Sequence, residues 1–107
     1  MVIDDATISR AAELLRDAAP PGSEVILFGS HARGDAGEDS DVDFLVVEPE
    51  VPAKHAEMVR LRSVLDPLRI AADVIVMSRR DYEYWADNPG TLSYEAHQEG
   101  RRLGTSS

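Results

Sequence analysis

Three short apolar runs constrain the fold of this chain more than any other feature. They cover residues 24–28, 42–47 and 72–77, and valine, isoleucine, leucine and phenylalanine dominate them. Short runs of this kind, bounded by glycine, proline or charged residues, are typical of buried β-strands. The sequence therefore predicts three strands of a small sheet.

The segments around these strands have the periodicity of helices. Residues 6–19 place apolar side chains on one helical face, and the proline pair before Gly22 ends that helix. Pro52 suits the first turn of a second helix, Ser78 resembles the N-cap of a third, and residues 92–99 predict a last short one. The order α-β-β-α-β-α-α indicates an α/β (α+β) fold with a small mixed β-sheet flanked by helices.

Length and composition limit the class of protein. A chain of 107 residues suits a single domain, residues 1–107. No run approaches the roughly 18 apolar residues that cross a bilayer, and the acidic start lacks the basic flank of a signal peptide. The absence of cysteine excludes disulfides, zinc–thiolate sites and thiol catalysis. We expect a cytoplasmic protein with no membrane contact.

The charge balance argues against nucleic acid as a partner. The chain carries 20 acidic and 11 basic residues, for a net charge of −9, and Lys54 is its single lysine. Binding to nucleic acid irrespective of sequence depends on lysine and arginine side chains that neutralise phosphates. A protein that holds a long duplex by itself is therefore disfavoured.

Two carboxylates stand at the start of the second apolar run. Asp41 and Asp43 are two residues apart, so a strand would point both to one face, roughly 6 to 7 Å apart. Like charges this close raise each other's pKa unless a cation lies between them. Mg²⁺ prefers such oxygens, and two ions can clamp a phosphoryl displacement. Asp73, at the head of the third run, would complete the set if the two strands are neighbours.

The glycine–serine pair after the first run predicts phosphate contact. Gly29 would let the backbone approach an anion closely, and Ser30 would begin a helical turn whose N–H groups favour phosphate. Arg33 is a further candidate for phosphate contact, although surface arginines are more often merely solvated.

Other interpretations of this stretch fit less well. The segment from Asp39 onward begins like a calcium-binding loop, but Phe44 stands where the sharp-turn glycine belongs. No Gly-Lys-Ser/Thr follows Gly29, which excludes a P-loop. Solvated turn carboxylates are the remaining alternative, and they leave the spacing and the third acid as coincidences.

The pair Gly29-Ser30, ten intervening residues and the motif Asp41-Val42-Asp43 resemble the signature of the DNA polymerase beta-like nucleotidyltransferase superfamily. The fuller stretch, including Ser40 before the aspartates, is similar to its small bacterial branch, the minimal nucleotidyltransferases. The resemblance runs from the first helix to residues 99–103, and it implies the nucleotidyltransferase fold.

The resemblance also implies roles for individual residues. Three carboxylates would be catalytic and would hold two Mg²⁺ ions: Asp41, Asp43 and Asp73. Four residues would bind the nucleotide: Gly29, Ser30, Arg33 and Ser40.

Many members of this branch are antitoxins that transfer AMP from ATP to a tyrosine of a partner toxin of the HEPN type. The resemblance therefore implies a protein adenylyltransferase with ATP as substrate and a HEPN-type toxin as partner. Two alternatives stay open: the same chemistry on another acceptor, such as an aminoglycoside-like molecule or a nucleic-acid 3′ end, and a non-catalytic module that neutralises its toxin by contact. The oligomeric state is not fixed, and a homodimer stays open.

Overall fold

The structure, a computed structural model, describes residues 3–34, 36–37 and 41–105, and within them it contains one four-stranded sheet. The strands are β1 (Glu24–Phe28), β2 (Val42–Glu48), β3 (Ala72–Ser78) and β4 (Arg101–Thr105). Their order across the sheet is β3-β2-β1-β4, with β1 antiparallel to both β2 and β4, and β2 parallel to β3. The predicted mixed sheet and the pairing of the second and third strands are confirmed.

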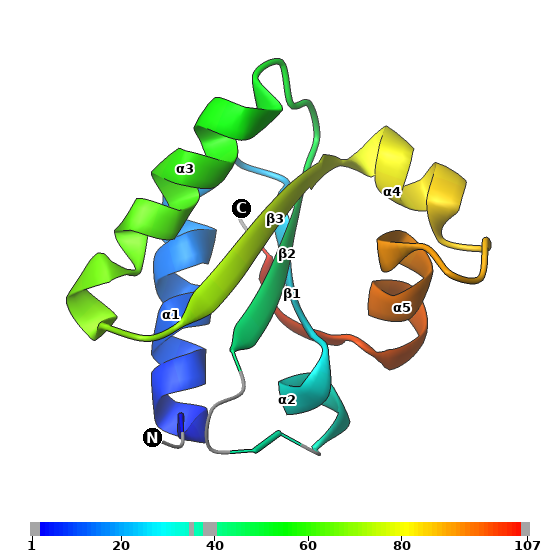
Figure 1. Cartoon of the computed structure of the whole chain (residues 1–107). Helices are drawn as coiled ribbons and strands as arrows, with labels where there is room; N and C mark the ends of the chain where they lie inside the picture. Colours follow the sequence, from blue (N-terminus) through cyan, green and yellow to red (C-terminus); the bar gives the residue numbers. More distant parts are fainter. Residues whose placement is uncertain (1–2, 35, 38–40, 106–107) are drawn as a thin grey trace.

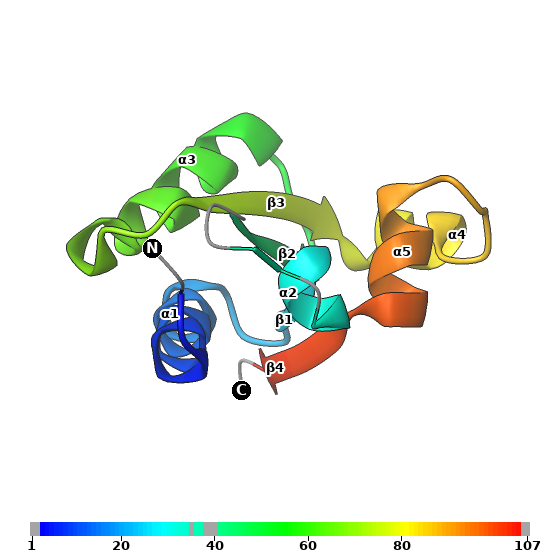
Figure 2. The ribbon, with the colours of Figure 1, turned by 60° about the horizontal axis from the view of Figure 1, so that its bottom comes forward.

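Helices cover both faces of this sheet (Figure 1). They are α1 (Asp5–Ala18), α2 (Ser30–Arg33), α3 (Lys54–Val64), the 3-10 turn η1 (Asp66–Leu68), α4 (Arg79–Trp85) and α5 (Leu92–Glu99). The helices α1 and α3 lie on one side of the sheet and α4 and α5 on the other, as Figure 2 shows from below. Within the described ranges, no helix is long and apolar enough to cross a bilayer.

The central strand β2 explains why its sequence is an unbroken apolar run. Val42, Phe44 and Val46 join the core cluster formed with α1 and α3. Leu45 and Val47 join the second cluster, formed with α4 and α5. A strand that is buried on both faces has no solvent side on which polar residues could alternate.

One strand and one helix start differ from the sequence prediction. The strand β4 was not predicted, because Arg101-Arg102 and Gly104 interrupt the apolar pattern that identifies the other strands. It pairs with β1 at the edge of the sheet with a register shift, and this backbone pairing identifies it as a strand. The helix α3 begins at Lys54, two residues beyond Pro52.

The aromatic residues of α4 are divided between core and surface. Their helical spacing favours a core position over a partner surface, and a core position is confirmed for Tyr82, which is 3% exposed. It is wrong for Tyr84 and Trp85, which are 69% and 44% exposed. Their rings pack edge to face against each other, with centroids 4.8 Å apart.

One acidic side chain of the described residues is fully enclosed by the core. Glu48 ends β2, where its residue is 2% exposed. Burial raises the pKa of Glu48 to about 8, and so do a hydrogen bond to Glu57 and the negative charge of that carboxylate, while the positive charge of Arg60 opposes the rise. The folded protein therefore holds Glu48 in its protonated form at neutral pH.

The stability of the protein should consequently fall as pH rises from the ordinary glutamate pKa of 4.5 to about 8. In this window the unfolded chain ionises Glu48 and the folded chain does not, so the unfolded state binds fewer protons. Glu48→Gln removes this titration. We expect its advantage over the parent protein in unfolding free energy to grow by about 1.4 kcal/mol per pH unit between the two pKa values, and so to be several kcal/mol larger at pH 8 than at pH 4. Urea unfolding at both pH values measures this, and an equal difference at the two would contradict it.

Candidate active site

Several predicted site residues meet at one edge of the sheet. Because β1 is antiparallel to β2 and β2 is parallel to β3, the C-terminal end of β1 and the N-terminal ends of β2 and β3 lie together (Figure 1). Phe28 pairs with Asp43, and Asp43 pairs with Asp73. We term this region the carboxylate edge and define it by five residues: Gly29, Ser30, Asp41, Asp43 and Asp73.

Asp43 and Asp73 lie side by side on neighbouring strands. Residues in register on paired strands point to the same face, and successive residues alternate. Asp43 therefore shares its face with Leu45, which packs toward α4 and α5. Asp43 is half-buried, whereas Asp41 and Asp73 are exposed. The strand register places Asp73 beside Asp43, as the sequence predicted for neighbouring strands.

The charges at this edge repel one another. Burial raises the pKa of Asp43, and the negative charges of Asp73, Asp41 and Glu95 raise it further, while the charge of His31 acts in the opposite direction. A cation placed among these oxygens would relieve the repulsion and favour the ionised form of Asp43. The electrostatics of the edge therefore favour a bound cation.

Gly29 brings the start of α2 into contact with the Asp43 carboxylate. Its φ of +77° is in the region that favours glycine, and the N–H groups of Ala32 and Arg33 both donate to its carbonyl oxygen at 3.1 Å. A Cβ atom on Gly29 would overlap the carboxylate of Asp43. The backbone at the start of α2 thus lies directly against the central carboxylate, although ten residues separate Ser30 from Asp41 in the sequence.

The predicted nucleotide-binding residue Arg33 is directed toward α5. Arg33 ends α2, and its guanidinium contacts Glu95 at 3.1 Å and Glu99 at 3.4 Å, both on α5. Nucleotide contact by Arg33 would require it to leave these carboxylates, and it stays a prediction. Ser40 lies outside the described residues.

Glu95 is a component of the site that sequence reasoning missed. It carries one of the charges that raise the pKa of Asp43, and it also binds Arg33. The sequence contains only a weak indication of this role. Glu95 and Glu99 are four residues apart, so they lie on one face of a helix, and such a pair can bind a basic side chain. Nothing in the sequence placed that face beside α2.

Glu95→Gln should lower the pKa of Asp43. The substitution removes one of the negative charges that raise this pKa, and it weakens the hold of α5 on the Arg33 guanidinium. A pH titration of the Asp43 carboxyl carbon by NMR measures the change, with Glu83→Gln on the exposed side of α4 as control. An unchanged or higher pKa in the Glu95 variant would be incompatible with this arrangement.

The donor atoms of the carboxylate edge fit Mg²⁺ that arrives with phosphate. Within the described part of the chain, no three histidine, cysteine or acidic side chains are grouped closely enough to form a metal centre alone. Mg²⁺ is commonly held by only one or two carboxylates together with water and substrate phosphates. Asp43 beside Asp73, with Asp41 two residues before, supplies this kind of incomplete oxygen set.

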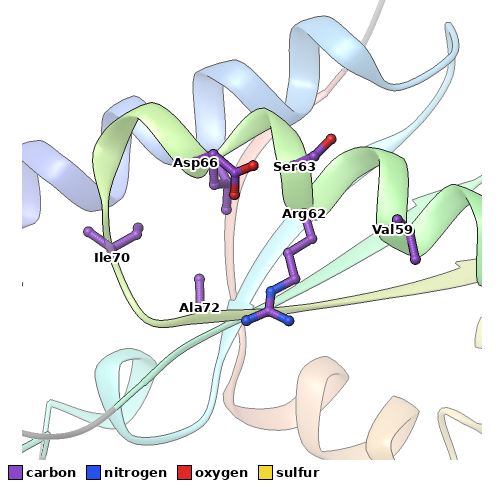
Figure 3. A pocket seen from close by; sticks show the side chains of 7 residues that line it. Val59, Arg62, Ser63, Asp66, Ile70 and Ala72 are labelled. Carbon is purple, nitrogen blue, oxygen red and sulfur yellow. The ribbon is translucent and has the colours of Figure 1, made fainter.

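Two cavities lie along β3 and α3. One of about 310 Å³, drawn in Figure 3, is lined by Arg62, Asp66 and Ile70 among others, and no residue of the carboxylate edge lines it. The other, of about 210 Å³, is lined by Met58, Arg62, Asp73 and Ile75. Open space thus lies along the outer edge of β3 at Asp73, between this strand and α3.

A family model described as a nucleotidyltransferase domain matches residues 8–94. This chain belongs to the nucleotidyltransferase domain family. The matched segment contains the whole carboxylate edge, and membership agrees with the resemblance seen in the sequence motif.

Relatives of this nucleotidyltransferase domain extend the comparison. Over 28 residues it is 64% identical to a candidate protein adenylyltransferase, MJ0141, of Methanocaldococcus jannaschii. That match covers 26% of the chain and 28% of the relative, so the chain matches just over a quarter of the length of this relative. A match of this extent supports a shared motif and leaves the activity and partners to be proposed.

Two solved structures share the fold of this nucleotidyltransferase domain. One is a chain from tri-AMPylated Shewanella oneidensis HEPN toxin in complex with MNT antitoxin, with a TM-score of 0.62, 19% identity, and coverage of 97% of this chain and 74% of that one. The other is a chain of a toxin–antitoxin structure with AMP-PNP, with a TM-score of 0.59, 23% identity, and coverage of 98% and 76%. At these identities the likeness establishes the nucleotidyltransferase fold, which the sequence predicted.

Proposed function

We propose that this protein is a Mg²⁺-dependent nucleotidyltransferase that transfers AMP from ATP to a hydroxyl group. The observation that carries the proposal is the convergence of Gly29-Ser30, the Asp41/Asp43 pair and Asp73 at one edge of the sheet. Membership of the nucleotidyltransferase domain family supports the same chemistry.

Asp41, Asp43 and Asp73 would hold Mg²⁺ together with the phosphates of the nucleotide. When bound, the metal neutralises charge on the reacting phosphate and on the pyrophosphate that leaves. Gly29 contributes the lack of a side chain, which leaves room for the Asp43 carboxylate beside the start of α2, and Ser30 would contact the phosphates there. Positioning and electrostatics of this kind supply most of the acceleration in phosphoryl transfer.

Asp73 has the position suited to the acceptor. It is exposed, it pairs in register with Asp43, and it lines a cavity whose walls include Met58 and Ile75. An acceptor with an apolar body could place its hydroxyl near this carboxylate, which would orient the hydroxyl and take its proton. The leaving pyrophosphate would then depart on the side away from the acceptor, in line with the attack.

We further propose that the acceptor is a tyrosine of a HEPN-type toxin and that this protein acts as the antitoxin. The support is the fold shared with a chain from a complex that contains an AMPylated HEPN toxin, and with a chain from a toxin–antitoxin structure with AMP-PNP. The net charge of −9 also suits a protein partner better than nucleic acid.

Incubation of the protein with α-labelled ATP, Mg²⁺ and the product of the adjacent gene tests this proposal. We expect label on the partner, with the modified residue identified as tyrosine by peptide mass spectrometry, and no label when EDTA is present. Tight binding of the partner without label would replace the proposal by a non-catalytic module. Label on an aminoglycoside-like small molecule, but not on the partner, would replace the acceptor while retaining the chemistry.

A further inference from the structure

The helix α2, which begins with Ser30, has little packing of its own to hold it in place. It is four residues long, and Ala32 packs partly against the core, but none of the four residues is buried. A helix of this length is not stable by itself, because its nucleation costs more than a single turn of hydrogen bonds returns. The position of α2 beside the carboxylate edge therefore depends on its contacts with neighbouring elements.

The helix α5, by contrast, is packed firmly on the sheet. Ser93 and Ala96 are buried, and Ala96 belongs to the same core cluster as Ile26 of β1. Gly100 follows the helix, and a Cβ atom there would overlap both the Ala96 carbonyl oxygen and the Ile26 side chain. The closeness of this packing makes α5 a fixed support for groups that bind to its exposed face.

Arg33, the last residue of α2, connects this short helix to α5. Its Nη1 atom donates to Oε1 of Glu95 at 3.1 Å and to Oε2 of Glu99 at 3.4 Å. We term these three residues the Arg33 clamp. Ion pairs that are partly exposed, as these are, usually contribute little to overall stability. A modest energy is nevertheless enough to position a helix that has no buried residue.

The charges around the clamp favour Arg33 staying on α5 when a nucleotide binds. Glu95 acts on the carboxylate edge, since its negative charge is among those that raise the pKa of Asp43. The guanidinium of Arg33 offsets this charge. If Arg33 left for the nucleotide, Glu95 and Glu99 would both lose this cation, and Glu95 would then repel the phosphates.

We propose that Arg33 is a positioning residue: held by Glu95 and Glu99, it keeps the Gly29-Ser30 turn against the Asp43 carboxylate. The inference rests on the proposed function. It differs from the role that the sequence resemblance implies, in which Arg33 itself binds the nucleotide. The two roles give the glutamates opposite effects. As anchors of Arg33 they aid nucleotide binding, whereas as competitors for its guanidinium they oppose it.

A double-mutant cycle on nucleotide affinity distinguishes the two roles. Glu95→Gln and Glu99→Gln are introduced together into the parent protein and into Arg33→Met, and the dissociation constant of a non-hydrolysable ATP analogue with Mg²⁺ is measured for all four proteins. The direct effect of removing two negative charges occurs in both backgrounds and cancels. We expect the glutamine substitutions to weaken binding about three- to tenfold more in the parent than in Arg33→Met. A difference of the opposite sign, or none, would overturn the proposal.

Hydrogen exchange of the α2 amides tests the clamp without nucleotide. The N–H group of Ala32 donates to the Gly29 carbonyl oxygen, and that of Gly34 donates to the Ser30 carbonyl oxygen. Protection of these two amides should fall about threefold or more in Arg33→Met. Arg10→Met is the matched control, because it removes an ion pair of the same 3.1 Å length on α1 and should leave the α2 amides unchanged.

The exchange measurement keeps this inference separate from the proposed function. Failure of the parent protein to bind the ATP analogue would contradict the proposed function, and reduced amide protection in Arg33→Met would then still show that the clamp holds α2. Normal nucleotide binding by the parent protein, together with unchanged protection in Arg33→Met, would overturn the clamp alone.

Discussion

Replacement of Asp43 by asparagine should reduce AMP transfer by about a thousandfold or more while the protein remains folded. Asp43 is the central member of the carboxylate edge: it pairs in register with Asp73 and lies against the backbone of Gly29. Asparagine keeps the shape of the side chain but removes the charge that a metal requires. The loss of the charge also removes repulsion with Asp41 and Asp73, so stability should not fall.

Rates of label transfer from α-labelled ATP, together with thermal unfolding, measure both effects. Asp87→Asn is the matched control, because Asp87 is an exposed aspartate in the turn between α4 and α5. Transfer by Asp43→Asn at a rate within tenfold of the parent protein would contradict the proposed role of Asp43 in metal binding. A loss of the same size in Asp87→Asn would indicate that the assay reports something other than the site.

Gly29→Ala should remove nucleotide binding and lower the unfolding free energy by about 2 kcal/mol. Two causes add: the φ of +77° is unfavourable for alanine, and the new Cβ atom would overlap the Asp43 carboxylate. The Asp43 carboxylate would have to turn away from Gly29 to make room for the Cβ atom. The phosphate-binding turn and the metal-binding carboxylates would therefore be displaced together.

Gly90→Ala provides a control that separates these causes. Gly90 has a similar φ of +89°, and no described atom lies within 4 Å of the position of an added Cβ. It should show the backbone strain alone, with nucleotide affinity retained. Equilibrium binding of a non-hydrolysable ATP analogue and urea unfolding compare the two variants. If both lost affinity equally, the contact between Gly29 and Asp43 would not be the reason.

The sequence was sufficient to predict the central strands and the placement of Asp43 beside Asp73. Asp43 and Asp73 each stand at the head of an apolar run, and a run that is apolar throughout indicates a strand buried on both faces. Two such strands pack best as neighbours, which brings their first residues together. Gly29 directly follows β1, whose last residue, Phe28, pairs with Asp43. Gly29 therefore lies beside the two aspartates.

The features that escaped prediction depend on contacts between distant segments. The strand β4 is defined by backbone pairing with β1 and carries no apolar signal of its own. The pairing of Arg33 with Glu95 and Glu99 needs α5 to lie beside α2, which no local pattern encodes. Glu48 reads in the sequence as the polar end of a strand, and only the packing of α3 over that end encloses it.

The most direct test of the central claim is calorimetric titration of the protein with a non-hydrolysable ATP analogue, in the presence and absence of Mg²⁺. We expect Mg²⁺-dependent binding to the parent protein and its loss in the Asp41→Asn/Asp43→Asn double variant, with Asp87→Asn unaffected. Equal binding to the parent protein and the double variant would contradict the assignment of the carboxylate edge as the site for metal and nucleotide.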